Sequence, residues 1–245
     1  MNVNSNGYTY TFATIMVVVV AVLLSAAALG LSDVQKSNVE QEKMQSILAS
    51  VGVDVDRSEA KASYDKVITQ VLTIKGGKVV SKDREAGFNI DMAAAIKIPN
   101  MPQPLASEIE LDTVNVRKVP LYVANKGGET YYIVPMRGKG LWGPVWGFVS
   151  LEADGNTVVG ANFGHKSETP GLGAEIVDSS FYKPFTGKKI SDSEGFRSIS
   201  VVKKGSSEGN DYAVDGISGG TITSNGVNDM LADCLAPYAE YFKNI

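Results

Sequence analysis

Residues 215–224 read Asp-Gly-Ile-Ser-Gly-Gly-Thr-Ile-Thr-Ser, a glycine-rich turn that stands directly before a regular apolar pattern. The apolar side chains of that pattern recur every three or four residues: Val227, Met230, Leu231, Cys234, Leu235, Tyr238 and Phe242. This spacing predicts an amphipathic helix that buries one stripe, with Cys234 as a packed thiol. Thr221 and Thr223 are therefore expected at or just before the N-terminus of the helix.

Two interpretations of this helix start remain open from the residues alone. Free backbone N–H groups and the positive end of the helix dipole suit an anion, above all a phosphate. Alternatively, one hydroxyl caps the first turn, and the candidates are Ser218, Thr221, Thr223 and Ser224. A nucleotide-binding P-loop is not supported, because no Gly-Lys-Ser/Thr pattern occurs here.

Two further segments combine glycine with small or polar residues. Residues 138–147 read Gly-Lys-Gly-Leu-Trp-Gly-Pro-Val-Trp-Gly, and residues 165–173 read His-Lys-Ser-Glu-Thr-Pro-Gly-Leu-Gly. Glycine at this density lets the backbone approach a neighbour closely or make turns that need a positive φ. Taken one at a time, each segment is also typical of an ordinary surface turn.

Composition excludes several classes of protein. The chain has 245 residues and a formal net charge of -4, which argues against a nucleic-acid-binding protein because such proteins present a basic face. One Cys and one His exclude an intrachain disulfide and any Cys-rich or multi-histidine metal site built by this chain alone, so no metal site is expected. The strand-like runs do not alternate with helices in βαβ units, which argues against a dinucleotide-binding Rossmann domain.

The central and C-terminal parts predict an α+β fold, with a twisted, mainly antiparallel sheet and helices packed against it. Short strand-like runs recur between glycine-rich breaks, at Glu108–Val116, Glu129–Met136, Trp146–Leu151, Thr157–Asn162 and Arg197–Val202. Two helices are expected before the sheet, over Asp33–Val51 and Ser58–Ile74. We therefore expect a helical juxtamembrane segment over residues 32–77 and an α+β domain over residues 78–245.

The N-terminus contains a long uncharged stretch. Residues 1–10 form a short tail, and residues 11–31 are apolar enough and long enough to cross about 30 Å of hydrocarbon, which predicts a single transmembrane helix. A cleaved signal peptide is the alternative, but no Lys or Arg precedes the stretch and its apolar core is long. Lys36 and Lys43 follow it, and flanking charge alone would favour a cytoplasmic C-terminal domain.

Residues 215–221 resemble the flavinylation motif of the FMN-binding domain family, Asp-x-x-Ser/Thr-Gly-Ala-Thr, with Gly220 where the family usually has Ala. The segments at 168–173 and 138–147 resemble two further elements of the same family. The resemblance implies that a flavin transferase uses FAD to attach FMN through a phosphoester to the Thr221 hydroxyl. The chain would then be a covalent flavoprotein and, through the linkage, a phosphoprotein.

The same resemblance implies a set of cofactor-binding residues: Thr221, Ser218, Gly219, Gly220, Thr223, Glu168, Thr169, Leu172, Gly173, Lys203 and Trp142. Within this set, Glu168 and Thr169 would bond the polar edge or ribityl chain of the flavin. Leu172 and Gly173 would approach the ring through backbone groups, and Lys203 would face the N1–O2 region.

Other roles are less specific. Trp142 would stack on the flavin or belong to the core. Asp215 would orient the motif for the transferase or cap the turn at Gly216, and His165 is expected to be an ordinary loop histidine. No catalytic residue beyond the flavin is expected.

Over its whole length the chain is similar to the NqrC family of the sodium-translocating NADH:quinone oxidoreductases. The related RnfG component of the Rnf ion-translocating complex and a flavin-free, membrane-tethered interaction module are the alternatives. The resemblance implies electron transfer within a membrane complex, with the other subunits, the flavin transferase and membrane lipid as partners. It also implies the bacterial inner membrane with the domain on the periplasmic side, against the weak charge preference. No NADH oxidation is expected from this chain alone, because it has no nicotinamide-binding fingerprint.

Overall fold

The computed structural model describes residues 5–98 and 116–243. The chain forms two units, Met1–Lys43 and Met44–Ile245. Helix α1 (Asn6–Ser50) starts in the first unit and ends in the second. In the described residues it is the one helix long and apolar enough to cross a membrane, and its apolar window is fully exposed. The predicted helices over residues 11–31 and 33–51 are thus confirmed as one continuous helix that ends at Ser50.

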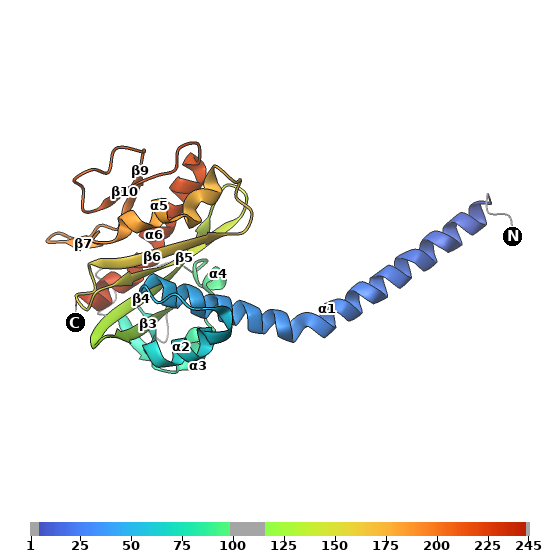
Figure 1. The fold of residues 1–245 in the computed structure, drawn as a ribbon, viewed down its shortest axis with the longest axis horizontal. Coiled ribbons are helices and arrows are strands. Elements are labelled where there is room, and N and C mark those ends of the chain that lie inside the picture. Colours follow the sequence, from blue (N-terminus) through green and yellow to red (C-terminus); the bar gives the residue numbers. More distant parts are fainter. Residues whose placement is uncertain (1–4, 99–115, 244–245) are drawn as a thin grey trace. The chain divides into compact units, whose positions relative to one another are not determined.

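The second unit is built on a six-stranded antiparallel sheet with the strand order β2-β1-β3-β4-β5-β6 (Figure 1). Its strands are β1 (Ile68–Lys75), β2 (Lys78–Ser81), β3 (Lys118–Lys126), β4 (Glu129–Lys139), β5 (Pro144–Leu151) and β6 (Val158–His165). Two small sheets accompany it: β9 (Ser200–Val202) pairs in parallel with β10 (Ala213–Asp215), and β7 (Ser191–Asp192) pairs with β8 (Gly195–Phe196). The predicted α+β class with a mainly antiparallel sheet is confirmed.

Helices lie on both faces of the large sheet (Figure 1). One face is covered by the long helix α6 (Thr221–Phe242), and the other by the end of α1 with α2 (Ala60–Val67). The shorter helical elements are η1 (Arg57–Glu59), α3 (Arg84–Phe88), α4 (Met92–Ala95), η3 (Gly173–Val177), α5 (Ser179–Tyr182) and η4 (Lys183–Phe185).

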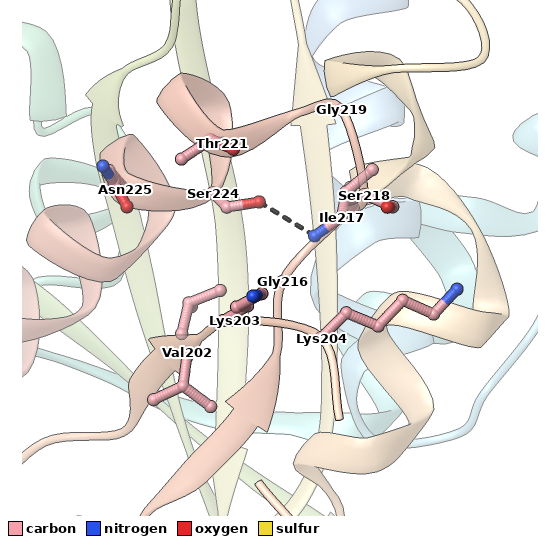
Figure 2. A pocket seen from close by; sticks show the side chains of 11 residues that line it. Val202, Lys203, Lys204, Gly216, Ile217, Ser218, Gly219, Thr221, Ser224 and Asn225 are labelled. Carbon is pink, nitrogen blue, oxygen red and sulfur yellow. Dashed lines mark hydrogen bonds between the residues drawn. The ribbon is translucent and has the colours of Figure 1, made fainter. Parts of the chain in front are cut away.

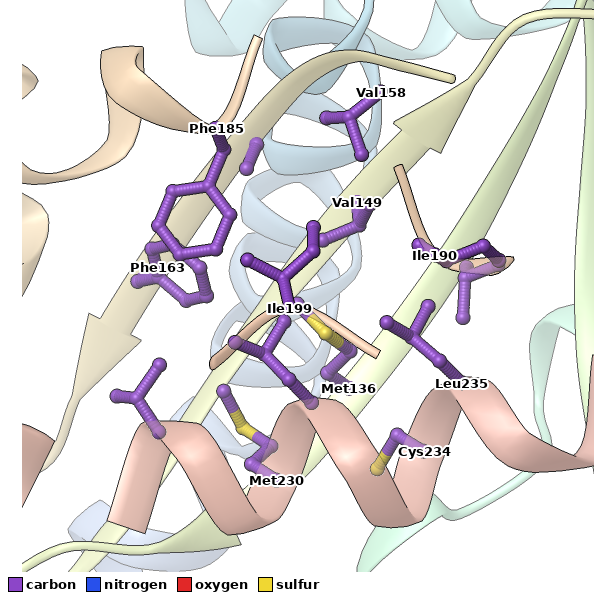
Figure 3. Packing of buried hydrophobic residues seen from close by; sticks show 14 of the residues in the cluster. Met136, Val149, Val158, Phe163, Phe185, Ile190, Ile199, Met230, Cys234 and Leu235 are labelled. Carbon is purple, nitrogen blue, oxygen red and sulfur yellow. The ribbon is translucent and has the colours of Figure 1, made fainter. Parts of the chain in front are cut away.

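Neighbouring residues of the strands belong to two separate hydrophobic cores, one on each face of the sheet. Leu121 and Val134 belong to the core under α6, whereas Tyr122 and Ile133, one residue away, belong to the core under α1 and α2. This follows from the strand geometry, because successive side chains point to opposite faces of a sheet. Figure 3 shows the core under α6, where Met230 and Leu235 face side chains of the sheet.

The predicted stripe of α6 is confirmed. Of its seven members, all are buried except Phe242, which is half-buried and packs against the same core. The Cys234 thiol is buried and lies 3.4 Å from the backbone nitrogen and 3.4 Å from the backbone oxygen of Arg137. Burial raises the pKa of Cys234 to about 11, so the residue is a packed, unreactive thiol.

The predicted helix over Ser58–Ile74 is wrong in its second half. Helix α2 ends at Val67, and Ile68–Lys75 forms strand β1, which lies between β2 and β3 in the sheet. The last five residues of this strand are all buried, including the polar Thr73 and Lys75. The apolar residues Tyr64, Val67, Ile68, Val71 and Leu72 recur every three or four positions, so the helical spacing continues past the end of α2 and does not separate helix from strand here. The sheet therefore includes residues on both sides of position 78, where the α+β domain was expected to begin.

Two further differences concern the strands. The predicted strand Glu108–Val116 lies outside the described residues, apart from Val116, which is not in a strand. Strand β3 was not predicted, and it contains Pro120, a residue that is atypical of a central strand. Pro120 is tolerated because it pairs with Thr73 of β1, whereas the ladder to β4 begins only at Tyr122.

The end of α1 is bonded closely to the sheet. The Ser150 hydroxyl donates to the Ser50 hydroxyl at 2.6 Å, and the Lys126 ammonium donates to the carbonyl of Val51 at 2.8 Å. A Cβ at Gly160 would lie 2.4 Å from the carbonyl oxygen of Ser50, so only glycine allows this approach. These contacts fix the C-terminal end of α1 and the residue after it to strands β3, β5 and β6.

Candidate functional site

The three glycine-rich segments meet around the start of α6. Residues 138–147 join β4 to β5, residues 165–173 follow β6, and residues 215–224 join β10 to α6. Pairing of β5 with β6 sets Val145 opposite His165, which brings the first two segments together at one end of the sheet. Helix α6 packs against β4, which brings in the third.

The glycines are required by this convergence. A Cβ at Gly140 would lie 2.6 Å from Oε1 of Glu168, and a Cβ at Gly173 would lie 2.3 Å from Oγ1 of Thr223. A Cβ at Gly226 would lie 2.1 Å from the carbonyl oxygen of Lys139. Real Cβ atoms do not approach other atoms so closely, so side chains at these positions would force the segments apart. The glycine density therefore serves the packing of the three segments on one another.

Glu168 stands at the centre of the convergence and is 5% exposed. Its Oε2 accepts a 2.6 Å hydrogen bond from the Thr223 hydroxyl, and its Oε1 accepts a 2.9 Å bond from the backbone N–H of Trp142. Burial raises the pKa of Glu168, but these bonds and one from the backbone of Leu141 outweigh burial and hold the pKa below its usual value. The carboxylate is thus charged at neutral pH and links all three segments.

The start of α6 leaves the Thr221 hydroxyl accessible. Thr221 is the first residue of the helix and is exposed, whereas Thr223 is 2% exposed. The N-cap residue is Gly220, and no side-chain hydrogen bond caps the described start of the helix there. The Ser224 hydroxyl instead accepts from the backbone N–H of Ile217 at 3.0 Å, which fixes the preceding turn (Figure 2). The structure therefore does not support the alternative in which a Ser or Thr hydroxyl caps the first turn of α6.

A cavity of about 630 Å³ opens beside Thr221 (Figure 2). It is lined by Val201, Val202, Lys203, Lys204, Gly216, Ile217, Ser218, Gly219, Thr221, Ser224 and Asn225. Of the predicted site residues, Ser218, Gly219, Thr221 and Lys203 share this cavity. Two lysines and a helix N-terminus around one exposed hydroxyl make the cavity suited to a phosphate ester.

Asp215 holds the loop that carries the two lysines. Its carboxylate accepts backbone N–H groups of Gly205 at 2.7 Å, Ser206 at 3.1 Å and Ser207 at 3.0 Å. The bond from the Gly205 backbone, followed by bonds from Ser207, lowers the pKa of Asp215. The carboxylate thus fastens residues 205–207 to the motif, rather than capping the turn at Gly216. A second cavity, of about 490 Å³, adjoins this loop and shares Lys204, Gly216, Ile217 and Ser218 with the first.

The remaining predicted residues do not line the cavity beside Thr221. Leu172 is 42% exposed, and a Cβ at Gly219 would lie 2.7 Å from its Cδ2, so Leu172 packs against the motif turn. The Thr169 carbonyl accepts from the N–H groups of Leu172 and Ala174 at 3.1 Å each and so closes the 169–174 turn. Gly220 and Gly173 are also close neighbours, since a Cβ at Gly220 would lie 3.2 Å from the Gly173 nitrogen.

Trp142 is 65% exposed and is therefore not a core residue. The sole histidine, His165, ends β6, and its Nδ1 accepts from the backbone N–H of Glu168 at 3.2 Å, as expected for a satisfied loop histidine. Sequence reasoning missed Lys204 and Asn225 in the cavity lining. For Lys204 the available signal was its position directly after Lys203, and for Asn225 its position one helical turn after Thr221.

Comparisons with known proteins agree with this geometry. Residues 140–236 match the family described as FMN-binding domain. The chain is 34% identical over 211 residues to the NqrC component of the Na(+)-translocating NADH-quinone reductase from Vibrio campbellii, covering 84% of this chain and 81% of that protein. It is 32% identical over 215 residues to the same component from Neisseria meningitidis, covering 86% and 82% of the two chains.

Two solved structures are similar as well. A crystal structure of the same reductase component from Parabacteroides distasonis has 41% sequence identity and a TM-score of 0.73, and the match covers 86% of this chain and 96% of that one. The Shewanella oneidensis NqrC structure has 25% identity and a TM-score of 0.66, covering 84% and 99%.

Proposed function

Because the chain belongs to the NqrC family of the Na(+)-translocating NADH-quinone reductase and contains that family's FMN-binding domain, we propose that it carries FMN covalently on Thr221 and transfers electrons within the membrane complex. The observation that carries the proposal is the exposed Thr221 hydroxyl at the uncapped start of α6, in a cavity with Lys203 and Lys204. When bound, FMN supplies the redox chemistry, and the protein holds and tunes it.

The cavity fits the phosphate end of the cofactor. In the transfer, a bond forms between the Thr221 oxygen and the FMN phosphorus of FAD, the pyrophosphate bond breaks, and AMP leaves. The hydroxyl proton goes to a base of the transferase. The remaining negative charge of the phosphodiester would lie at the positive end of the α6 dipole and near the two lysines, and both stabilise it.

Thr223 is the poorer acceptor of the two motif threonines. Its hydroxyl is buried and donates to the ionised Glu168 at 2.6 Å, so modification would require breaking that bond and opening the packed segments. The Thr221 side chain is exposed and lines the cavity, so its modification does not require the packed segments to open (Figure 2).

The apolar part of α1 supports the membrane setting of the proposal, since its window of mean hydropathy 2.7 is long enough to span a bilayer. We place the chain in the bacterial inner membrane as a single-pass protein, with the flavin domain on the periplasmic side implied by the family resemblance. Its partners are then the other subunits of the complex, membrane lipid and, during maturation, a flavin transferase. The relatives described above are NqrC proteins, which favours this assignment over the RnfG component of the Rnf complex.

Fluorescence on a denaturing gel tests the covalent linkage. The full chain co-expressed with its flavin transferase should give a fluorescent band under ultraviolet light, and Thr221→Ala should abolish it while the protein stays folded. Thr223→Val is the matched control and should keep the band. A dark wild-type band would instead support the flavin-free interaction module. NADH oxidation by the isolated chain would contradict the electron-relay role.

A further inference from the structure

We propose that Glu168 is a positioning residue of the flavin site: its buried carboxylate binds the backbone of Trp142 to the first turn of α6 and so holds the exposed indole in a fixed place near the acceptor helix. The bearing of this link on flavin binding rests on the proposed function. The link itself is a property of the polypeptide and can be tested without flavin.

Both oxygens of the Glu168 carboxylate have partners within the protein. Oε2 accepts from the Thr223 hydroxyl at 2.6 Å, and Oε1 accepts from the Trp142 N–H at 2.9 Å. The two donors come from segments 81 positions apart in the sequence, since 223 − 142 = 81. One side chain therefore joins the turn before β5 to the first turn of α6.

The surrounding backbone is shaped around this carboxylate. A Cβ at Gly140 would lie 2.6 Å from Oε1, and a Cβ at Gly173 would lie 2.7 Å from Oε2. Two glycines from different segments thus leave space for the carboxylate on either side. This arrangement gives the carboxylate a fixed position, which a surface glutamate would lack.

The charge of Glu168 strengthens the link. A buried carboxylate is destabilising unless it accepts hydrogen bonds, and bonds to an ionised acceptor are shorter and stronger than neutral ones. The pKa of Glu168 is held low, with burial opposed by the bonds from Thr223, Trp142 and Leu141, so the charged form is present at neutral pH. An ionised carboxylate only accepts, which fixes the Thr223 hydroxyl as the donor.

Trp142 depends on this link for its position. Its side chain is 65% exposed, so side-chain packing alone holds it weakly, and its backbone N–H is bonded to Glu168. Removing the carboxylate leaves the backbone of Trp142 with the 3.2 Å bond that its carbonyl accepts from the Ser167 hydroxyl, and we expect the indole to become more mobile. Glutamine at position 168 has the same shape, and its amide can accept from Trp142 and donate to the Thr223 oxygen, so it retains most of the link.

Tryptophan fluorescence tests the proposal directly, because the chain has 2 tryptophans and Trp146→Phe leaves Trp142 as the only one. In this background, without flavin, we expect Glu168→Ala to lower the fluorescence anisotropy of Trp142 and to increase its quenching by acrylamide. Glu168→Gln should largely restore both. Glu175→Ala is the matched control, because Glu175 lies in the adjoining turn and accepts from Gly171 instead. It should leave Trp142 unchanged.

Circular dichroism and cooperative thermal unfolding establish that each variant is folded. A folded Glu168→Ala variant with the anisotropy of its parent would overturn the proposal, as would an equal loss in Glu175→Ala. If Glu168→Ala does not fold, Thr223→Val decides: it removes the Thr223 link with little change in volume and should lower the anisotropy of Trp142 by a smaller amount. No change would then overturn the proposal.

Flavin loading separates this proposal from the proposed function. With the transferase present, Glu168→Ala should give a weaker fluorescent band than Glu168→Gln. If wild type carries no flavin, the proposed function fails, while the anisotropy results still decide whether Glu168 holds Trp142.

Discussion

The Thr223 hydroxyl donates a 2.6 Å hydrogen bond to Oε2 of Glu168, and this bond distinguishes the two threonines of the motif. Thr223 lies in the packed interior where three segments meet, whereas Thr221, two residues earlier, is exposed at the cavity. Local structure alone thus makes one hydroxyl available for modification and assigns the other to the framework of the site.

Replacing Thr223 with valine should destabilise the protein without preventing flavin attachment. The change leaves a buried carboxylate without one of its donors, and hydrogen bonds to charged groups contribute about 1.5–3 kcal/mol. We expect a loss of that order in the free energy of unfolding, measured with urea. A fluorescent band should persist on a denaturing gel. Loss of the band in a folded Thr223→Val protein would mean that Thr223 takes part in the linkage.

Replacing Gly173 with alanine should separate the segments at the site. The new Cβ would lie 2.3 Å from the Thr223 oxygen and 2.7 Å from Glu168, and overpacking of this kind destabilises by about 1–3 kcal/mol. Gly143→Ala is a suitable control, since its Cβ would lie no closer than 3.1 Å to its nearest neighbour, the Ser167 hydroxyl. Thermal unfolding should show a clearly larger loss for Gly173→Ala. Equal stability of the two variants would contradict the close packing described for Gly173.

Asp215 should contribute a pH-dependent stability. Hydrogen bonds, first from the Gly205 backbone and then from Ser207, hold its pKa below the usual aspartate value in the folded protein. For a lowered pKa, the contribution is fully present above the unfolded-state pKa of about 3.9 and is lost as the pH falls through the folded-state pKa. Asp215→Asn cannot titrate at this position.

The stability difference between wild type and Asp215→Asn should therefore be largest near neutral pH and shrink below about pH 4. Urea unfolding at a series of pH values measures it. A difference that stays constant down to the acid limit would show that the charge of Asp215 is not what holds residues 205–207.

Lys203 should influence the redox potential of the bound flavin. Reduced flavin gathers negative charge, and a nearby ammonium stabilises that charge, so Lys203→Ala should shift the midpoint potential to a more negative value. Lys203→Arg keeps the charge and should restore most of the potential. Spectroelectrochemical titration of the flavinylated domain in its full chain gives the values, and an unchanged potential in Lys203→Ala would remove Lys203 from the ring environment.

Helix α6 could be predicted from the sequence because its apolar residues repeat with a strong helical period that follows a glycine-rich turn. Strand β1 could not, because its residues Ile68, Val71 and Leu72 continue the helical spacing of the apolar residues in α2. Strand β3 was not predicted either, and it contains Pro120, which is atypical of a central strand but lies beyond the ladder to β4.

The residues of the site likewise include some that the sequence indicates and others that only the fold reveals. Thr221, Ser218 and Lys203 line one cavity, and each lies at or beside an expected element boundary, while their contacts with a flavin stay a prediction. The partnership of Glu168 with Thr223 spans 55 positions and has no local pattern, so only the fold reveals it. The sequence suggested that Glu168 bonds the flavin directly, and that contact stays a prediction beside the observed bonds to Thr223 and Trp142.

Peptide mass spectrometry of the mature full chain tests the covalent attachment at Thr221 most directly. We predict that the peptide containing Thr221 gains the mass of FMN less one water, that fragmentation places the addition on Thr221, and that Thr221→Ala removes it. An unmodified peptide from protein matured with its flavin transferase, or an addition located on Thr223, would contradict attachment at Thr221.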